Sequence, residues 1–512
     1  MSLRFAPAHV AGGDRDVLAR LASAPAPLPS AVADALLARG AAEGNLAALS
    51  SGALAVTTGQ QPGLFTGPAM SVYKALSAAA LAGRLAERLD RPVVPVFWVA
   101  GDDHDFAEIN HCSVLGADGK VHRIVLRERA ADEPMLPAYR EAIGRSGDQA
   151  ISALEGLLPP SADAERTVDW LQRAYRADHS MAEGYAQAMA ELLGPFGIVV
   201  ARGWDARLKR AARSVMLDAA RRAAELEVAL ARRAEALRSE GRDVPVDVGQ
   251  GLTLLMLEGA AGRDRLRVLG AGRFAGRRGH EQLTLADLER IADDETERLS
   301  PNVLLRPVVE AAVFPTLAYV GGPSELKYLA QAEPLFALLG VSRQAFVGRA
   351  GGFLVEDKVD RVLTRYGLSV DALARPSAEL AARAAGEDMP APARQALERL
   401  KDAIIAAYAE LGAAAAAIEP TLARPAENAR NQALLGAGRI EKKIARALSR
   451  RSETALSQLG RAREALFPGG VPQERVLAMP SFLARYGRAA LDAAWVAARE
   501  HASGFLPASS GR

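Results

Sequence analysis

The chain has 512 residues, which is long enough to bury a large core and to form more than one structural unit. Its 63 Lys and Arg residues nearly balance its 61 Asp and Glu residues, and the formal charge of +2 gives no electrostatic reason to expect nucleic acid or an anionic membrane as a partner. Its one cysteine, Cys112, excludes an internal disulfide framework and fits a reducing compartment.

Targeting features are not evident in the sequence. The N-terminal stretch MSLRFAPAHVAGGDRD holds no apolar core of a signal peptide. Arg and Glu interrupt the Ala-rich stretches well short of the ~20 apolar residues that a membrane span needs. We therefore expect a cytoplasmic protein that does not bind membranes.

Strand and helix patterns alternate early in the chain. We expect a short helix at residues 31–39 and a first strand at residues 53–57, followed by a loop rich in Gly and Pro. Apolar residues take a helical spacing from Met70 onward, and an apolar run at residues 93–100 predicts a second, buried strand. This strand–loop–helix–strand order is typical of a parallel α/β sheet, and its helix N-terminus is suited to an anion.

The second strand leads into the densest group of titratable side chains in the chain. Seven of the first eight residues of VVPVFWVAGDDHDFAEINH are apolar, and Gly101 follows them. Because open α/β sheets bind ligands beyond the carboxyl ends of their strands, this group is the first candidate site. Its members are Asp102, Asp103, His104, Asp105, Glu108, Asn110 and His111.

The remaining core elements follow in order. We expect two strands around a turn at 117–119, a mostly helical insertion at 130–190, a buried strand at 195–201, one long charged helix at 206–240, a strand at 252–257 and a last strand region at 344–355. Before that last region, a strand at 317–320 meets Gly321, Gly322 and Pro323, and Ser324 is suited to cap the helix that follows.

The pattern of apolar residues changes after about residue 390. Leu397, Leu400, Ile404, Ala407 and Leu411 fall at alternating steps of three and four residues, which is typical of a coiled-coil seam. A second helix carries Ile440, Ile444 and Leu448 and continues to Leu466, so that a link near residues 420–427 predicts an antiparallel hairpin. Its apolar stripe is too narrow to be stable alone, and we expect docking or dimerisation.

Four segments together carry a resemblance to a known family. They are TGQQPGLFTGP with SVYK, FWVAGDDHDFAEINH, SPNVLLRP with LAYVGGPSELKY, and LFPGGVPQER. In these segments the chain resembles the bacillithiol-biosynthesis cysteine-adding enzymes, the cysteine ligases of the low-molecular-weight thiol pathway. The resemblance runs from about residue 50 to the C-terminus. It departs at Asp102, where members often carry Glu, and it is loose at residues 205–295.

The resemblance implies a fold and an activity. The implied fold is α/β, a Rossmann-like nucleotidyltransferase-type core at residues 1–385 with inserted connecting peptides at about 128–190 and 205–298. A coiled-coil arm at 386–466 is implied to form a homodimer, and residues 467–512 return to the core. The implied reaction joins L-cysteine, through its carboxylate, to the amine of glucosaminyl-malate, the last step of bacillithiol biosynthesis.

This chemistry assigns roles to the candidate residues. Amide formation needs an activated carboxylate, so we expect ATP, with or without Mg²⁺, as co-substrate and no tightly bound cofactor or metal. The amine needs a base and the developing oxyanion needs donors, and the catalytic candidates are His104, Asp103 and Asp105. Lys74 and Arg306 are the cations expected at phosphate or the malate carboxylates. The remaining binding candidates are Gly59, Gln60, Gln61, Thr66, Gly67, Asn110, His111, Gly321, Gly322 and Glu325.

Structural roles compete with these assignments. Asp105 followed by Glu108 is also the pattern of a helix N-cap, and His111 is equally a hydrogen-bonded histidine. Each glycine segment can be a simple turn, and Tyr319 and Tyr328 either stack on a base or pack in the core. Cys112 is expected to be inert packing.

Two other functions compete with the ligase. If a helix began near Asp105, then His104, Glu108 and His111 would lie close to one face and suit the zinc or iron of a metal-dependent hydrolase. A noncatalytic scaffold that recruits other thiol-pathway enzymes is the third hypothesis. The ligase requires residues 59–67, 102–105 and 321–325 to meet at one rim of a shared parallel sheet.

Overall fold

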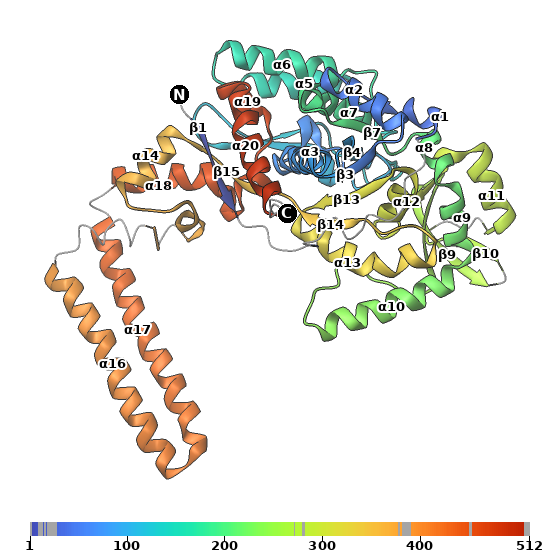
Figure 1. Ribbon diagram of the computed structural model, residues 1–512. Helices are drawn as coiled ribbons and strands as arrows, with labels where there is room; N and C mark the ends of the chain where they lie inside the picture. Colours follow the sequence, from blue (N-terminus) through green and yellow to red (C-terminus); the bar gives the residue numbers. More distant parts are fainter. Residues whose placement is uncertain are drawn as a thin grey trace. The chain divides into compact units, whose positions relative to one another are not determined.

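The computed structural model describes residues 3–8, 14, 17, 28–270, 272–278, 282–376, 379–380, 391–449 and 453–505 (Figure 1). The chain divides into two compact units. The larger, called the α/β unit below, comprises Leu3–Asp118, His122–Leu354 and Glu474–Arg512, and the smaller, helical unit is mainly Val355–Gln473. The sequence interpretation placed these divisions at 385/386 and 466/467, and the first of those positions lies outside the described residues.

A six-stranded sheet forms the centre of the α/β unit, in the order β14-β13-β3-β4-β7-β2. Five strands are parallel, and the edge strand β2 runs antiparallel to β7. The bounds are β2 (Leu36–Leu37), β3 (Leu54–Gln60), β4 (Val93–Val99), β7 (Val199–Arg202), β13 (Thr316–Gly321) and β14 (Ala345–Gly348). The parallel α/β fold predicted from the sequence is therefore confirmed.

The central strands are apolar because both faces of the sheet are covered. Every residue of β4 is buried, as the continuous apolar run predicts for an inner parallel strand. Pro95 lies one residue before the β4 ladder to β7 begins at Val96, so its missing N–H costs no bond on that side. Helix α3 (Met70–Leu89) packs against β3 and β4 and, on its other side, against α20 (Ala489–Ser503), which explains why it is buried on nearly all faces.

Sequence patterns placed several helix ends wrongly. The helix expected at 31–39 is α1 (Ser30–Ala33) followed by β2, because pairing with β7 overrides local helix propensity. The single helix expected at 206–240 is three helices, α8 (Ala206–Ala211), α9 (Arg213–Arg221) and α10 (Ala223–Ser239), with non-helical residues between them. Helix α13 (Pro323–Leu338) is capped by Gly322, whose N–H donates to Glu325 Oε2 at 2.8 Å, and not by Ser324.

A second, antiparallel sheet was not foreseen beyond its first strand. It has the order β11-β10-β9-β8-β12. Its apolar residues join the main core, which explains how a segment of such mixed sequence folds. The bounds are β8 (Leu252–Gly259), β9 (Gly262–Gly270), β10 (Arg273–Gly276), β11 (Gln282–Thr284) and β12 (Leu299–Pro301).

The other elements of the α/β unit follow the sequence patterns closely. Two strands flank the predicted turn at 117–119, three helices fill the insertion at 130–190, and the C-terminal segment returns to this unit, as expected. These elements are β1 (Leu3–Ala8), α2 (Ala41–Ser50), α4 (Phe106–Ile109), β5 (His111–Leu115), β6 (Val121–Val125), α5 (Gly144–Glu155), α6 (Ala162–Ala174), α7 (Met181–Leu193), α11 (Leu285–Asp294), α12 (Arg306–Val313) and α19 (Pro480–Tyr486).

The helical unit contains the predicted hairpin. Helices α16 (Ala391–Ile418) and α17 (Ala423–Ser449) pack along each other, and Lys401 pairs with Glu441 at 2.7 Å across them. The residues of the predicted apolar stripe differ in burial: Leu397 is buried, whereas Leu411 is 53% exposed. Strand β15 (Gly351–Glu356) leads into this unit, which also holds α14 (Asp357–Arg365) and α18 (Glu453–Leu466). Within the described residues, no helix is both long and apolar enough to span a membrane.

Candidate active site

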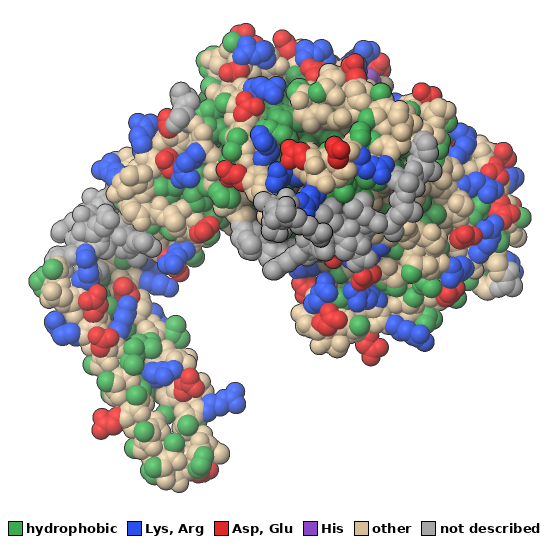
Figure 2. All heavy atoms as spheres, in the orientation of Figure 1, with side chains coloured by type: hydrophobic (Ala, Val, Ile, Leu, Met, Phe, Trp, Pro, Cys, Tyr) green, Lys and Arg blue, Asp and Glu red, His purple; other side chains and the backbone are tan. Residues whose placement is uncertain are grey.

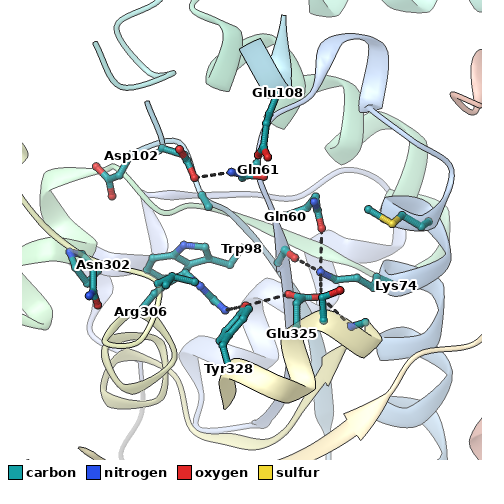
Figure 3. Close-up of a pocket in the computed structure, with 18 of the residues that line it drawn as sticks. Gln60, Gln61, Lys74, Trp98, Asp102, Glu108, Asn302, Arg306, Glu325 and Tyr328 are labelled. Atoms are coloured by element: carbon teal, nitrogen blue, oxygen red, sulfur yellow. Dashed lines mark hydrogen bonds and ion pairs between the residues drawn. The ribbon is translucent and has the colours of Figure 1, made fainter. Parts of the chain in front are cut away.

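The carboxyl ends of three neighbouring parallel strands open into one cavity of about 500 Å³ (Figure 3). Gly59, Gln60 and Gln61 reach it from the end of β3, Asp102 and Asp103 from the end of β4, and Gly322 to Glu325 from the end of β13. Part of each of the three segments that the ligase hypothesis requires at one rim therefore lines one cavity.

The glycine loop after β3 is shaped by close backbone approach. A Cβ on Gly59 would lie 2.7 Å from the carbonyl oxygen of Trp98 on the next strand, so only glycine fits there. Thr66 and Gly67 both have positive φ angles, and the Thr66 N–H donates to the Tyr175 hydroxyl at 3.0 Å. These two residues set the path of the loop and do not line the cavity, contrary to their expected binding role.

Acidic side chains gather at the end of β4. Asp103 accepts from Gln61 Nε2 at 2.5 Å and from the backbone N–H of Asp105 at 3.0 Å. Burial pushes the pKa of Asp103 up, but these hydrogen bonds and the charge of Arg263 outweigh it and hold the pKa below its ordinary value. Asp102 pairs with the buried Lys209 at 2.7 Å, whereas the exposed Glu108 forms no ion pair within the described part of the chain.

Lys74 and Arg306 lie in the cavity wall, but each is already paired with an acid. Lys74 Nζ contacts Glu325 at 2.6 Å and Gln60 at 3.0 Å, and also the carbonyl oxygen of Gly59. Arg306 pairs with the fully buried Glu310 at 2.7 Å. Figure 3 shows Glu325 between Lys74 and Tyr328. Lys74 therefore links β3 to α13, whereas Arg306 links α12 to β13 and α13 through the hydroxyls of Tyr319 and Tyr328. Because both cations are paired with acids, little of their charge is left for a phosphate or a carboxylate.

Tyr319 and Tyr328 belong to the same network. Tyr319 donates to Glu325 at 2.8 Å, and Tyr328 donates to the same oxygen at 3.3 Å. Burial raises the pKa of both phenols well above the ordinary value, so they remain neutral donors. Tyr328 lines the cavity and Tyr319 does not, so only Tyr328 is placed to contact a ligand.

Comparison with known proteins gives one consistent family. Residues 29–350 match the model described as the Bacillithiol biosynthesis BshC N-terminal Rossmann-like domain, and residues 352–505 match the model of the BshC C-terminal coiled-coil domain. The chain belongs to the bacillithiol biosynthesis BshC family.

Curated members of the BshC family align over most of the chain. The protein of Salinibacter ruber named "Putative cysteine ligase BshC" is 32% identical over 445 residues, covering 86% of this chain and 80% of the relative. Proteins of the same name from Symbiobacterium thermophilum and Solibacter usitatus are 31% and 30% identical, each covering 85% of this chain and 80% of the relative.

Several candidates of this BshC chain take structural roles. Asp105 is exposed and caps α4, accepting from the Glu108 N–H at 3.3 Å, so the N-cap interpretation is confirmed. Asn110 is buried and donates to the Arg127 carbonyl oxygen, and His111 contacts Asn110. Gly321 ends β13 behind the cavity wall. His104 is half-buried and is not itself a lining residue.

The geometry required by the metal-dependent hydrolase is absent. Helix α4 ends at Ile109, and His111 begins strand β5, so His104, Glu108 and His111 do not share a helical face. Among the residues that the structure describes, no group of three His, Cys, Asp or Glu side chains is arranged to hold a metal ion. Cys112 is buried, and burial raises the pKa of its thiol to about 12, as expected for inert packing.

Several residues that line the cavity were not predicted from the sequence. Arg263 comes from β9 of the unforeseen sheet, Asn302 follows β12, and Arg349 follows β14. Arg349 is held by a two-pronged ion pair with Glu474, at 2.9 and 2.5 Å. Asn302, in the segment SPNVLLRP, and Arg475, in LFPGGVPQER, carried a signal, since both segments were part of the family resemblance.

Proposed function

We propose that this BshC chain is a ligase that joins L-cysteine, through its carboxylate, to the amine of glucosaminyl-malate, the last step of bacillithiol biosynthesis. Family membership over nearly the whole chain supports the cysteine ligase activity. The observation that carries the proposal is the convergence of three strand ends on one cavity that is lined by both carboxylates and cations.

The carboxylates that line the cavity, Asp103 and Glu108, are suited to the amine of glucosaminyl-malate. The amine must lose a proton before it attacks, and a carboxylate is a suitable acceptor. Asp103 is ionised and held by Gln61, so it can orient an ammonium group. We assign the proton acceptor to Glu108, because it lines the cavity and no ion pair within the described part of the chain neutralises it.

The carboxylate of cysteine must be activated, and ATP, accompanied by Mg²⁺, is the co-substrate we propose. The cavity offers the N-terminus of α13, with the Ser324 hydroxyl, and the exposed Arg475 for phosphate oxygens. The Gly322 N–H is already bonded to Glu325, so phosphate binding would rely on the other groups. This arrangement supports a nucleotide between the ends of β3 and β13.

We further propose that two copies pair through the helical hairpin in the cytoplasm. Figure 2 shows apolar side chains on the surface of this hairpin. Ile405, Leu411, Leu435 and Ile440 are each between 48% and 57% exposed, which is costly for side chains that face only water. A second hairpin would cover them.

The test is reconstitution with purified protein. Incubation with L-cysteine, glucosaminyl-malate, ATP and Mg²⁺ should yield the cysteinyl amide, detected by mass spectrometry, with stoichiometric nucleotide consumption. Omitting any one substrate should abolish the product. Glu108→Gln should lower kcat by about 10²- to 10⁴-fold, the usual contribution of a general base, and leave nucleotide binding intact. Absence of product with every substrate supplied would overturn the proposal.

A further inference from the structure

Arg263 differs from the other buried cations that line the cavity. Lys74, Arg306 and Arg349 are each paired with a carboxylate. Arg263 is only 8% exposed, yet no carboxylate lies within 4.0 Å of it in the described part of the chain. Asp102 and, to a smaller extent, Asp103 are near enough to influence its pKa, but neither forms an ion pair with it within the described residues. A buried guanidinium without a direct partner is expensive, so its position calls for a negative group that arrives with the ligand.

Three contacts fix the orientation of the guanidinium. Nε donates to Ser300 Oγ at 2.9 Å, Nη2 donates to the Pro301 carbonyl oxygen at 2.8 Å, and Nη1 lies 3.4 Å from His104 Nδ1. Arginine has five N–H groups and no acceptor, so His104 Nδ1 must offer its lone pair and the ring proton must lie on Nε2. Two N–H groups, one on each terminal nitrogen, have no partner among the described residues. Such N–H groups donate well to the oxygens of a carboxylate or a phosphate.

We propose that Arg263 binds an oxyanion of the substrate in the cavity, and that neutral His104 is a positioning residue that holds its guanidinium instead of acting as the general base. This inference rests on the proposed ligase function and deepens it, because both glucosaminyl-malate and ATP bring such oxyanions.

The charges around His104 favour its neutral form. Arg263 approaches from β9, Arg278 lies beyond β10, Arg129 donates to the His104 carbonyl oxygen, and Asp103 and Asp105 flank the ring in sequence. Burial and the Arg263 guanidinium lower the pKa of His104, outweighing the two acids. At neutral pH the ring therefore keeps the lone pair that orients Arg263.

Binding measurements with two probes test the role of Arg263. Isothermal titration calorimetry would compare L-malate and ATP binding to the wild type, to Arg263→Gln and to Arg267→Gln, a matched loss of one exposed arginine from the same strand. Arg263→Gln should weaken one probe by about 10- to 100-fold, the usual effect of removing a charged hydrogen-bond pair, and the control should bind both normally. Selective loss of malate would identify a carboxylate, and selective loss of ATP a phosphate. The proposal is overturned if the wild type binds neither probe or if the variant binds both as well as the wild type.

Two measurements on His104 test its positioning role. In the wild type, ¹⁵N NMR should show Nδ1 unprotonated and Nε2 protonated at pH 7.5, a readout that does not depend on any variant folding. His104→Gln retains an acceptor and should preserve probe binding, whereas His104→Ala should reproduce the loss seen with Arg263→Gln. A protonated Nδ1, or normal binding by His104→Ala, would overturn the role. Neither readout uses ligase activity, so failure of the ligase proposal would be seen separately.

Discussion

The ion pair between Lys74 and Glu325 should be one of the most important single contacts of the α/β unit. Lys74 is 1% exposed, and Glu325 accepts from it at 2.6 Å, as well as from Gly322 and two tyrosines. Lys74→Met leaves the partly buried Glu325 carboxylate, which is 19% exposed, without its ion-pair partner, and should cost about 2–3 kcal/mol, less than the loss of one partner from a fully buried pair. Glu325→Gln should cost a similar amount, because Lys74 is then the unpaired charge. The double variant removes both charges and should cost far less than the two single losses together.

Urea unfolding followed by tryptophan fluorescence measures this coupling. All four tryptophans, Trp98, Trp170, Trp204 and Trp495, lie in the α/β unit, so the signal reports on that unit alone. The double-mutant cycle should give a coupling free energy above about 1.5 kcal/mol, within the range for groups in direct contact. Additive losses, with a coupling below about 0.5 kcal/mol, would refute the view that Lys74 serves Glu325 first and a ligand second.

Three further predictions concern packing, pH and assembly. Gly203→Ala should lower stability by about 1–3 kcal/mol and disturb the cavity, because the added Cβ would lie 2.4 Å from Trp98 Nε1. The control Gly83→Ala has open space around its Cβ and should be neutral or stabilising. Equal urea midpoints for the two variants would contradict this prediction. Because the pKa of His104 is lowered in the folded chain, below about pH 6.5 the unfolded chain binds a proton that the folded chain resists, and stability should fall as the pH drops through this range. His104→Gln should make the melting temperature fall less steeply with decreasing pH. An unchanged slope would contradict this prediction. Leu411→Glu should convert the proposed dimer to a monomer in light scattering after size-exclusion chromatography, and an unchanged mass would show that this face is not the interface.

Patterns that depend on one segment of chain predicted the fold well. The apolar run of β4 and the helical spacing from Met70 are set by local burial, and both elements begin where the sequence predicts. The prediction of one long helix at 206–240 was wrong because the chain breaks it at Ala212 and Arg222, where no Gly or Pro marks the break in the sequence. The antiparallel sheet was missed beyond β8 because Arg-rich β9 does not look like a strand that reaches a core.

The candidate site was predicted in outline and less well in detail. The glycine and acid segments were found because strand ends in parallel sheets share one edge, and Gln61 and Asp103 do meet there. The partners of Lys74 could not be foreseen, because Glu325 lies 251 residues away. The role of Arg263 could not be foreseen either, because it depends on a guanidinium that is buried beside the cavity without a direct ion pair among the described residues. Only the assembled structure shows this property.

A crystal structure of the protein with glucosaminyl-malate bound is the most direct measurement of the central claim. The ligand should occupy the cavity at the ends of β3, β4 and β13, with its amine toward Asp103 and Glu108 and an oxyanion within 3.2 Å of Arg263. Ligand density elsewhere, with this cavity left to water, would contradict the claim that the three strand ends form the substrate site.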